Sequence, residues 1–386
     1  MLKIVVDATP VDPKQSGVGF YVANLICALD ALQQEENFQL GVAYQPGLKK
    51  WLQCNFTFPN YLEHYSQKHL LPLPVRISDL LLATSFKPSL AYFEKYFGFP
   101  DILHGTNYSV YPCQNSLKVI NIYDLTFIKY PNYIDSVVQT YARKVKRCLQ
   151  WTDLVLTISE SSKKDIIEYL QVDPKKIWVT PLASRYHSDY LCGKNIQELE
   201  NKVSYDFSKP YLLFVSTIEP RKNINSIITA FNFLKFQYKI DHQLILIGKK
   251  GWNYAPVFTA IETSPWQNEI HHLDYLSDEL VALFYSKADV FVYPSHYEGF
   301  GLPVLEAMTL GTPVIASNTS SIPEVTGDAA ILIDPNEHVQ LAEAILKIIS
   351  DSELRQDLIN QGKERAKLFS WEITARKTLK AYRSII

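Results

Sequence analysis

The segment Pro294–Glu306 holds the densest group of residues that could do chemistry. Glu298 and Glu306 stand eight residues apart, and Gly299 and Gly301 follow the first of them. Carboxylates accept hydrogen bonds from hydroxyl groups, and glycines let backbone N–H groups approach a ligand closely. A helix that begins just after these glycines would add the positive end of its dipole. The combination suits a phosphate or a sugar, and the alternative is an ordinary glycine turn with a solvated glutamate.

A second group of residues lies in Thr217–Asn223, between an expected strand and an expected helix. Its two adjacent cations, Arg221 and Lys222, could neutralise a diphosphate. Arginine offers a bidentate fork to phosphate oxygens, and lysine offers a point charge. The alternative is a solvated basic turn, which is the usual role of an isolated Arg-Lys pair.

The first half of the chain offers weaker candidates at the ends of expected strands. Gly17 and Gly19 stand in an expected loop, but a dinucleotide-binding loop would have a third glycine where Val22 stands. His104 ends an expected strand and is either a ligand contact or a hydrogen-bonded core histidine. Asp124 also ends a strand, and it is either a functional carboxylate or a helix N-cap.

Composition narrows the class of protein. The chain has 386 residues, a net charge of −2, 47% hydrophobic residues and 20% charged residues. These values are those of a globular protein and argue against a disordered chain or a net-basic nucleic-acid binder. Five scattered cysteines form no CxxC motif and are expected to be reduced. No Asp-x-Asp, HExxH or Gly-x-Ser-x-Gly motif occurs, so no metal site and no serine hydrolase are expected.

Apolar and helical periodicities alternate along both halves of the chain, which favours parallel α/β sheets. The expected strands of the first half are Leu2–Val6, Leu40–Tyr44, Ile102–His104, Val119–Tyr123 and Leu154–Ile158. Those of the second half are Tyr211–Val215, Gln243–Ile247, Val290–Tyr293 and Pro313–Ala316. The expected domains are 1–190 and 210–368, with a linker over 191–209. The tract Tyr61–Phe99 reads as an irregular insertion packed on the first domain.

No apolar stretch is long and uncharged enough to span a bilayer, and the first residues do not resemble a signal peptide. We therefore expect a cytoplasmic protein. A cluster of basic residues, which comprises Arg143, Lys144, Lys146 and Arg147, is expected to be a solvated helix face. Its alternative function is peripheral contact with the anionic inner face of the membrane.

The segment Pro294–Glu306 resembles the Glu-x7-Glu signature of retaining GT-B glycosyltransferases of family four, also called group 1. The likeness continues without a gap through Asn318 and covers most of residues 210–335. The form Glu-Pro-Arg-Lys-Asn at 219–223 is similar to bacterial mannosyltransferase-like members. Ser216 and Asp274 depart from the family, where glycine is common at both positions.

The resemblance implies an α/β protein of two Rossmann-like doubly wound domains facing a central cleft. It implies that the last helix, over 369–386, crosses back to the first domain. The residues implied in catalysis are Arg221 and Lys222 on the diphosphate, Glu298 on sugar hydroxyls and His104 on the donor sugar. The residues implied in donor binding are Gly17, Gly19, Thr217, Tyr275, Leu276, Phe300, Gly301, Leu302 and Glu306, the last on the ribose. Asp124 is implied on the acceptor side.

The resemblance also implies the reaction. The expected activity is metal-independent, retaining transfer of a sugar to a glycan or lipid-linked acceptor, with mannose from GDP-mannose as the first choice. The nucleotide sugar is a substrate, so no cofactor is expected. The alternatives are a UDP-sugar donor, a non-hydrolysing sugar-nucleotide epimerase, or a degenerate protein that binds without turnover. An NAD oxidoreductase is disfavoured by the missing glycine.

Overall fold

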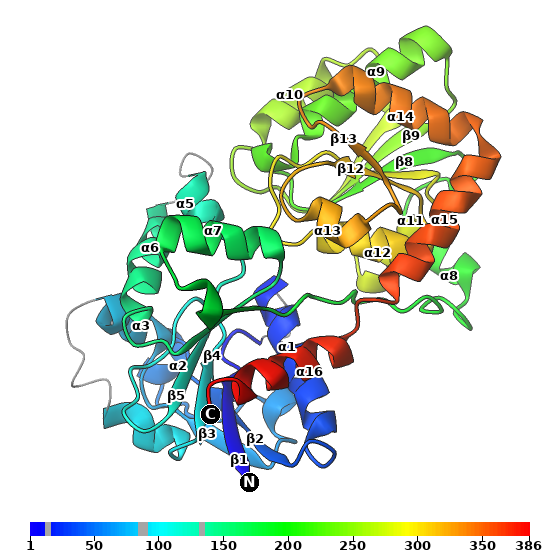
Figure 1. The fold of residues 1–386 in the computed structure, drawn as a ribbon. Helices are drawn as coiled ribbons and strands as arrows, with labels where there is room; N and C mark the ends of the chain where they lie inside the picture. Colours follow the sequence, from blue (N-terminus) through cyan, green and yellow to red (C-terminus); the bar gives the residue numbers. More distant parts are fainter. Residues whose placement is uncertain (12–16, 84–91, 131–135) are drawn as a thin grey trace. The chain divides into compact units, whose positions relative to one another are not determined.

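The computed structural model describes residues 1–11, 17–83, 92–130 and 136–386, and segments 12–16, 84–91 and 131–135 lie outside the description (Figure 1). The chain divides into two compact units. The first unit contains Met1–Leu182 and Trp371–Ile386, and the second contains Ala183–Ser370. Each unit has its own parallel sheet and its own core.

The first unit is built on a seven-stranded sheet in the order β3-β2-β1-β4-β5-β6-β7. Its strands are β1 (Leu2–Asp7), β2 (Phe38–Tyr44), β3 (Gln67–Leu70), β4 (Ile102–Gly105), β5 (Leu117–Asn121), β6 (Leu154–Thr157) and β7 (Ile177–Val179). Every pairing is parallel. The central strand β1 carries Ile4, Val5 and Val6, all buried, because helices cover both faces of a parallel sheet.

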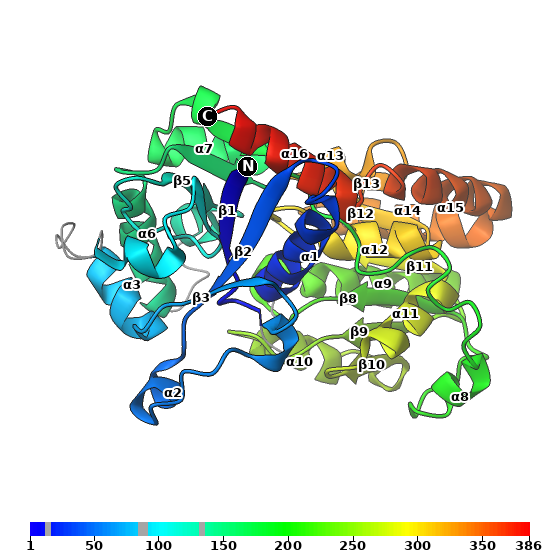
Figure 2. The ribbon, with the colours of Figure 1, turned by 90° about the horizontal axis from the view of Figure 1, so that it is seen from below.

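The helices of the first unit are α1 (Gly17–Leu32), α2 (Leu48–Leu52), α3 (Val75–Ala83), α5 (Thr126–Lys129), α6 (Ser136–Cys148), α7 (Glu160–Leu170) and α16 (Trp371–Arg383). The last helix, α16, lies beside α1, and α3 packs on α6 (Figures 1 and 2). The inner face of α16 includes Leu379 and Tyr382, both buried. The end of the chain therefore completes the core of the unit in which the chain begins.

The second unit is built on a six-stranded sheet in the order β10-β9-β8-β11-β12-β13. Its strands are β8 (Tyr211–Val215), β9 (Gln243–Ile247), β10 (Ile270–Leu273), β11 (Val290–Tyr293), β12 (Val314–Ser317) and β13 (Ile331–Ile333). Its helices are α8 (Ile196–Glu200), α9 (Ile224–Tyr238), α10 (Ala255–Glu262), α11 (Asp278–Lys287), α12 (Leu302–Leu310), α13 (Ile322–Thr326), α14 (His338–Ser350) and α15 (Ser352–Ala366).

Both sheets reverse their strand order beside their first strand. In the first unit the reversal lies between β1 and β4, and in the second it lies between β8 and β11. Loops that leave the carboxyl ends of two such strands run to opposite faces of the sheet, which opens a crevice where α/β proteins bind ligands. The fold thus selects the residues that follow β1, β4, β8 and β11 as candidates for function.

The structure confirms the two parallel α/β sheets and all nine expected strands, with small shifts at their ends. Four further strands, β3, β7, β10 and β13, were not predicted. They hold three or four residues each, and β3 (Gln-Lys-His-Leu) lacks the apolar pattern of a strand. The tract Tyr61–Phe99 also contains β3 and α3, so its described part is more regular than expected.

The boundary between the units falls at Leu182 and Ala183, earlier than the expected end of the first domain at 190. The segment expected as a linker, 191–209, belongs to the second unit. Leu199 of α8 packs against Leu280 and Leu283 of α11 in a small apolar cluster. The weak periodicity of this segment concealed these contacts because only one face of a short helix is buried. The helix α16 groups with the first unit, the position that the family resemblance implies.

We predict that Leu379→Ala destabilises the first unit by about 2–5 kcal/mol, because Leu379 is 1% exposed and its truncation leaves a cavity under α16. Denaturant unfolding gives the loss, and hydrogen exchange locates it. Faster exchange is expected in β1, β6 and α1, with little change in the second unit. Lys380→Ala, an exposed change on the same helix, is the control. Equal stability of the two variants would contradict the structural role of α16.

Candidate active site

The two cations of the second unit follow β8 at the reversal of strand order. Pro220–Lys222 form one turn of 3-10 helix, and Asn223 then adopts a left-handed conformation before α9. The side-chain amide of Asn223 donates to the carbonyl oxygens of Pro294 and Pro335, at 3.2 and 2.6 Å. This fixes the turn against the loop that follows β11.

Glu298 lies on the loop after β11 and contacts both cations. Its Oε1 accepts hydrogen bonds from Lys222 Nζ and from Ser295 Oγ, each at 2.6 Å. Its Oε2 lies 3.2 Å from Nη1 of Arg221. The hydroxyl of Tyr293 also accepts from Lys222 Nζ, at 2.8 Å. Residues from two different loops therefore form one buried charge cluster.

The backbone of Glu298 is held as firmly as its side chain. Its N–H donates to Ser320 Oγ at 2.9 Å, and its carbonyl oxygen accepts from Ser321 Oγ at 2.9 Å. Both serines stand in the loop that follows β12. The carboxylate is thus positioned by three neighbouring strand ends.

The electrostatics of this cluster favour an ionised carboxylate. Burial alone raises the pKa of Glu298, but Arg221 and Lys222 outweigh it and lower the pKa to about 2. Arg221 also forms an ion pair with Glu219 at 2.7 Å. Two cations and two carboxylates therefore balance in charge. An entering phosphate group would compete with these carboxylates for Arg221.

The glycine loop after Glu298 leads directly into α12. Gly301 is the N-cap residue, with φ of 102° in the left-handed region that favours glycine. A Cβ at this position would approach Ile322 Cδ1 to 2.6 Å, so the isoleucine side chain would have to shift. The helix begins without a side-chain cap, so its first N–H groups and the positive end of its dipole point to the loop.

Glu306, on the second turn of α12, has a separate cation. Its Oε1 accepts from Nε of Arg185 at 2.6 Å, and Arg185 Nη1 reaches Asp278 Oδ1 at 2.9 Å. Burial raises the pKa of Glu306, and Arg185 acts against this rise. The sequence predicted that Glu298 and Glu306 act together on one ligand. In the structure each carboxylate forms an ion pair with a different arginine, Glu298 with Arg221 and Glu306 with Arg185.

The remaining donor-side residues lie near the same edge of the sheet, but they differ in exposure. Thr217 and Tyr275 are exposed, and Leu276 and Leu302 are partly buried. The ring of Phe300 is buried against Phe369, with centroids 5.8 Å apart, so only its backbone remains for a ligand.

The two glycines that the sequence analysis placed in a loop, Gly17 and Gly19, lie in a helix of the first unit. Gly17 and Gly19 form the start of α1 rather than a loop, and Gly19 is buried within the helix. The prediction of a loop at these two positions was wrong, because the helix begins earlier than the apolar pattern showed. The loop itself, residues 12–16, lies outside the described residues.

His104 is a core residue of the first unit. Its Nε2 donates to Asn121 Oδ1 at 2.5 Å, and its Nδ1 accepts from the hydroxyl of Tyr382 at 2.7 Å. Burial lowers the pKa of His104 to about 4, so the ring is neutral near pH 7. The structure matches the alternative of a hydrogen-bonded core histidine, because both nitrogens are occupied and the side chain is fully buried. His104 also lines the pocket described below, and its role toward the donor sugar stays a prediction.

Asp124 lies one residue before Leu125, the N-cap of α5, so it is not the helix N-cap that its alternative described. Its Oδ1 accepts from the backbone N–H of Thr126 at 3.0 Å, at the start of α5. The carboxylate is half-buried, and its place on the acceptor side stays a prediction.

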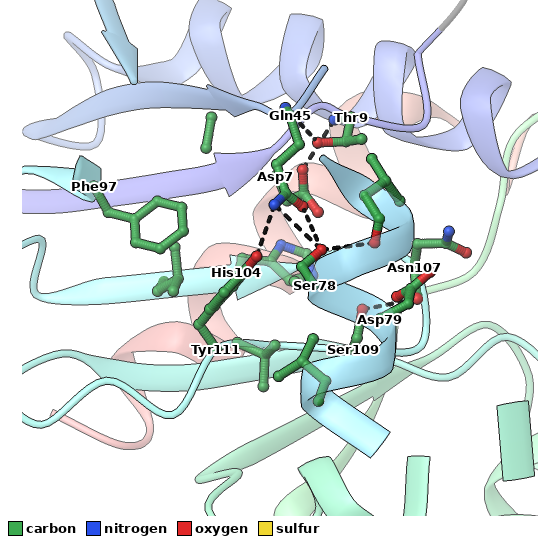
Figure 3. A pocket seen from close by; sticks show the side chains of 16 residues that line it. Asp7, Thr9, Gln45, Ser78, Asp79, Phe97, His104, Asn107, Ser109 and Tyr111 are labelled. Carbon is green, nitrogen blue, oxygen red and sulfur yellow. Dashed lines mark hydrogen bonds between the residues drawn. The ribbon is translucent and has the colours of Figure 1, made fainter. Parts of the chain in front are cut away.

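The first unit has a pocket at its own strand-order reversal (Figure 3). Its cavity is small, about 40 Å³, and is lined by residues that follow β1, β2 and β4 and by α3. Asp7 ends β1, and its Oδ1 accepts from the N–H of Thr9 at 2.9 Å. Gln45 donates to the hydroxyl of Tyr111 at 2.7 Å. Burial raises the pKa of Asp7. A buried carboxylate with amide and hydroxyl groups suits a neutral polyhydroxylated ligand.

Two kinds of site do not occur in the described residues. Within 1–11, 17–83, 92–130 and 136–386, no three His, Cys, Asp or Glu side chains gather as a metal site would require. None of the helices in the same ranges is long and apolar enough to cross a membrane.

Sequence reasoning missed several residues of these sites. Ser295 lies inside the segment that was singled out, but its hydroxyl function depends on a contact with Glu298. Asp7 follows a buried strand, which is a signal that could have identified it. Arg185 could not be found because its partner Glu306 lies 121 residues away in the sequence. Glu219 stands only two residues from its partner Arg221, but the sequence does not show the geometry of the turn that brings them together.

Two comparisons with known proteins agree on the family of this chain. Residues 195–365 match the family described as "Glycosyl transferases group 1". The chain is 34% identical over 284 residues to O-antigen chain mannosyltransferase B of Escherichia coli, and that match covers 73% of this chain and 74% of that protein. The chain therefore belongs to the group 1 glycosyltransferase family and is a glycosyltransferase.

Two further similarities are informative. The serotype-specific mannosyltransferase WbdA of Escherichia coli is 26% identical over 240 residues, which are 61% of this chain but only 29% of that protein. The solved structure of sucrose-phosphate synthase from Thermosynechococcus elongatus superposes with a TM-score of 0.71 over 100% of this chain and 99% of that one. At 20% identity it shows the fold alone, which is GT-B.

We predict that Glu298→Gln lowers the free energy of unfolding by about 3 kcal/mol at pH 7, because it leaves the ammonium of Lys222 buried beside Arg221. The carboxylate has a usual pKa of 4.5 and a folded pKa of about 2. Its contribution is therefore present above about pH 4.5 and is lost as the pH falls toward 2. Denaturant titrations from pH 7 to pH 3 should show the gap between variant and wild type narrowing below pH 4.5. A gap that does not depend on pH would refute the ion-pair account.

Proposed function

We propose that the protein transfers a mannosyl group from GDP-mannose to a glycan or lipid-linked acceptor, without a metal ion and with retention of configuration at the anomeric carbon. The observation that carries this proposal is the cluster of Arg221, Lys222 and Glu298 at the start of α12. It offers two cations and a helix N-terminus to a diphosphate, and preorganised charge of this kind stabilises a leaving group.

In this proposal the diphosphate takes over contacts that carboxylates make in the structure. Arg221 contacts Glu219 and Glu298, so it can turn to a phosphate oxygen while Lys222 remains on Glu298. The second oxygen of Glu298 is then available to accept a hydrogen bond from a sugar hydroxyl. One glutamate would thus orient both the cations and the sugar.

The chemical step breaks the bond between the anomeric carbon and the phosphate oxygen and forms a bond to the acceptor oxygen. The acceptor hydroxyl attacks from the side that the phosphate leaves, and its proton passes to a phosphate oxygen. Arg221 and Lys222 compensate the charge that develops on the leaving diphosphate. No carboxylate in the cluster is assigned as a covalent nucleophile, because Glu298 is committed to the two cations.

The acceptor is proposed to bind in the pocket of the first unit. The pocket combines a carboxylate, Asp7, with the polar groups of Gln45 and Asn107 and the apolar side chains of Val75 and Phe97. Sugars present hydroxyl groups at their rims and C–H groups on their faces, so both kinds of lining are useful.

The choice of mannose is supported by relatives. The two Escherichia coli proteins described above are named as mannosyltransferases, one of them for the O-antigen chain. A growing polysaccharide such as the O-antigen chain is the acceptor class that the first of these names favours. A UDP-sugar donor would use the same diphosphate cluster and is the competing outcome.

We predict that Arg221→Ala lowers kcat/KM by about 100-fold or more, because one hydrogen-bonding cation on a leaving group contributes roughly 3 kcal/mol to the transition state. The measurement is transfer from labelled GDP-mannose, with UDP-glucose in parallel. Lys367→Ala, which removes an exposed cation of the same unit, is the control. An active wild type with a fully active Arg221→Ala variant would refute the role of the cluster.

We predict that Asp7→Asn raises the acceptor KM by about tenfold, because one carboxylate oxygen becomes an NH2 group, which donates and cannot accept a hydrogen bond from a hydroxyl group. Donor binding, measured by calorimetry with GDP, should not change. The exposed change Asp30→Asn serves as the control. If Asp7→Asn instead weakens GDP binding and leaves the acceptor KM unaltered, the pocket is not the acceptor site.

A further inference from the structure

Arg185 is tied to the second unit by an ion-pair chain that begins just after the unit boundary. Its Nε donates to Glu306 Oε1 at 2.6 Å, and its Nη1 donates to Asp278 Oδ1 at 2.9 Å. Glu306 is 3% exposed, whereas the side chain of Arg185 is 33% exposed. A partly exposed guanidinium therefore reaches inward to a buried carboxylate.

This contact decides the charge and the orientation of Glu306. An unpaired buried carboxylate tends to take up a proton, and burial does raise the pKa of Glu306. Arg185 opposes that rise through its charge and its hydrogen bond. Arg185 occupies only Oε1. The other oxygen, Oε2, has a single long contact, 3.4 Å from the hydroxyl of Tyr285. It retains the capacity to accept a hydroxyl hydrogen bond.

The next residue, Tyr186, supplies an independent observation. Its side chain is 4% exposed, and its hydroxyl has no hydrogen-bond partner among the described residues. Its ring lies beside Arg185 and Tyr285, with centroid distances of 5.9 Å to the guanidinium carbon and 6.3 Å to the other ring. The charge of Glu306 contributes to the raised pKa of Tyr186, second to burial, so the two groups lie within electrostatic reach.

A buried hydroxyl without a partner costs free energy, roughly 1–3 kcal/mol. Native structures rarely leave such a group unsatisfied unless a ligand or a water molecule completes it. Here the hydroxyl is within electrostatic reach of Glu306, whose Oε2 also lacks a close partner, and its ring lies beside two residues that contact that carboxylate, Arg185 and Tyr285. A ligand with two adjacent hydroxyl groups could satisfy both, since one hydroxyl can donate to the carboxylate and the other can accept from the tyrosine.

We propose that Arg185 and Tyr186 are part of the subsite for the vicinal diol of the donor nucleoside, with Arg185 positioning Glu306 and Tyr186 donating to a ribose hydroxyl. The inference rests on the proposed function, which puts a nucleotide sugar in the second unit. It assigns a binding role to two residues just after the unit boundary, which the sequence analysis did not single out.

The first test compares nucleotides with and without the diol. Binding of GDP and of 2′,3′-dideoxy-GDP is measured by calorimetry, with UDP and its dideoxy analogue in parallel. Wild type should prefer the ribose form by about tenfold, the effect of losing one charge-assisted hydrogen bond. Tyr186→Phe should reduce this preference to about threefold. Its melting temperature should stay equal or rise, because the change removes an unsatisfied hydroxyl.

The second test uses pH and a conservative variant of Arg185. Removing Arg185 removes the group that opposes the rise in the pKa of Glu306, so Arg185→Ala should bind GDP more weakly as the pH falls from 8 to 6. Asp278, Tyr285 and Tyr186 also face this carboxylate and remain in place. Wild type and Arg185→Lys should show little dependence on pH over this range. If Arg185 had only a structural role, its removal would not make GDP binding depend on pH between 8 and 6.

A matched control is Lys194→Ala. Lys194 pairs with Glu279 of the same helix α11, and its side chain is 31% exposed. This variant should keep the preference for ribose. If Tyr186→Phe and Arg185→Ala also keep the wild-type preference, or if Arg185→Ala binds GDP more tightly, the inference is overturned. A wild type that binds no nucleotide would instead overturn the proposed function.

Discussion

The ion pairs that Glu298 makes with Arg221 and Lys222 set the form of the second unit's binding edge. A buried carboxylate between two cations must be held in position, because an unpaired charge in the interior costs several kcal/mol. Ser295, Ser320 and Ser321 supply that support from two loops. The turn after β8, the loop after β11 and the loop after β12 are therefore joined through a single side chain.

The strand order reverses beside the first strand in both units, but the charged and polar residues at the two reversals differ. In the second unit the reversal beside β8 carries balanced charges and a helix N-terminus, which suit a diphosphate. In the first unit the reversal beside β1 carries Asp7 and Asp79 among amides and hydroxyls, and Asp79 is paired with Lys144. The two sheets thus present sites of different chemistry. The proposed transfer would use this difference, because its donor is anionic and its acceptor attacks through a neutral hydroxyl group.

The segment that follows the unit boundary makes specific contacts with the second unit. Its residue Arg185 contacts the carboxylate that the family resemblance assigns to the ribose, and Leu199 of the same segment packs in a small apolar cluster of the second unit. His104 shows the opposite case, since a residue that resembled a ligand contact is held inside the first unit by Asn121 and Tyr382. A residue type alone does not decide between these roles.

The sequence by itself determined the fold class, the nine strands of strong apolar character and the two separate motifs that carry Arg221 with Lys222 and Glu298 with Glu306. These depend on local periodicity and on motifs in which the relevant residues stand close together along the chain. The tertiary structure alone decided which carboxylate meets which cation, that Gly17 and Gly19 belong to a helix, and that α8 belongs to the second unit. The physical reason is that burial and ion pairing join residues far apart in sequence, such as Arg185 with Glu306. A single sequence shows their types but not their distances.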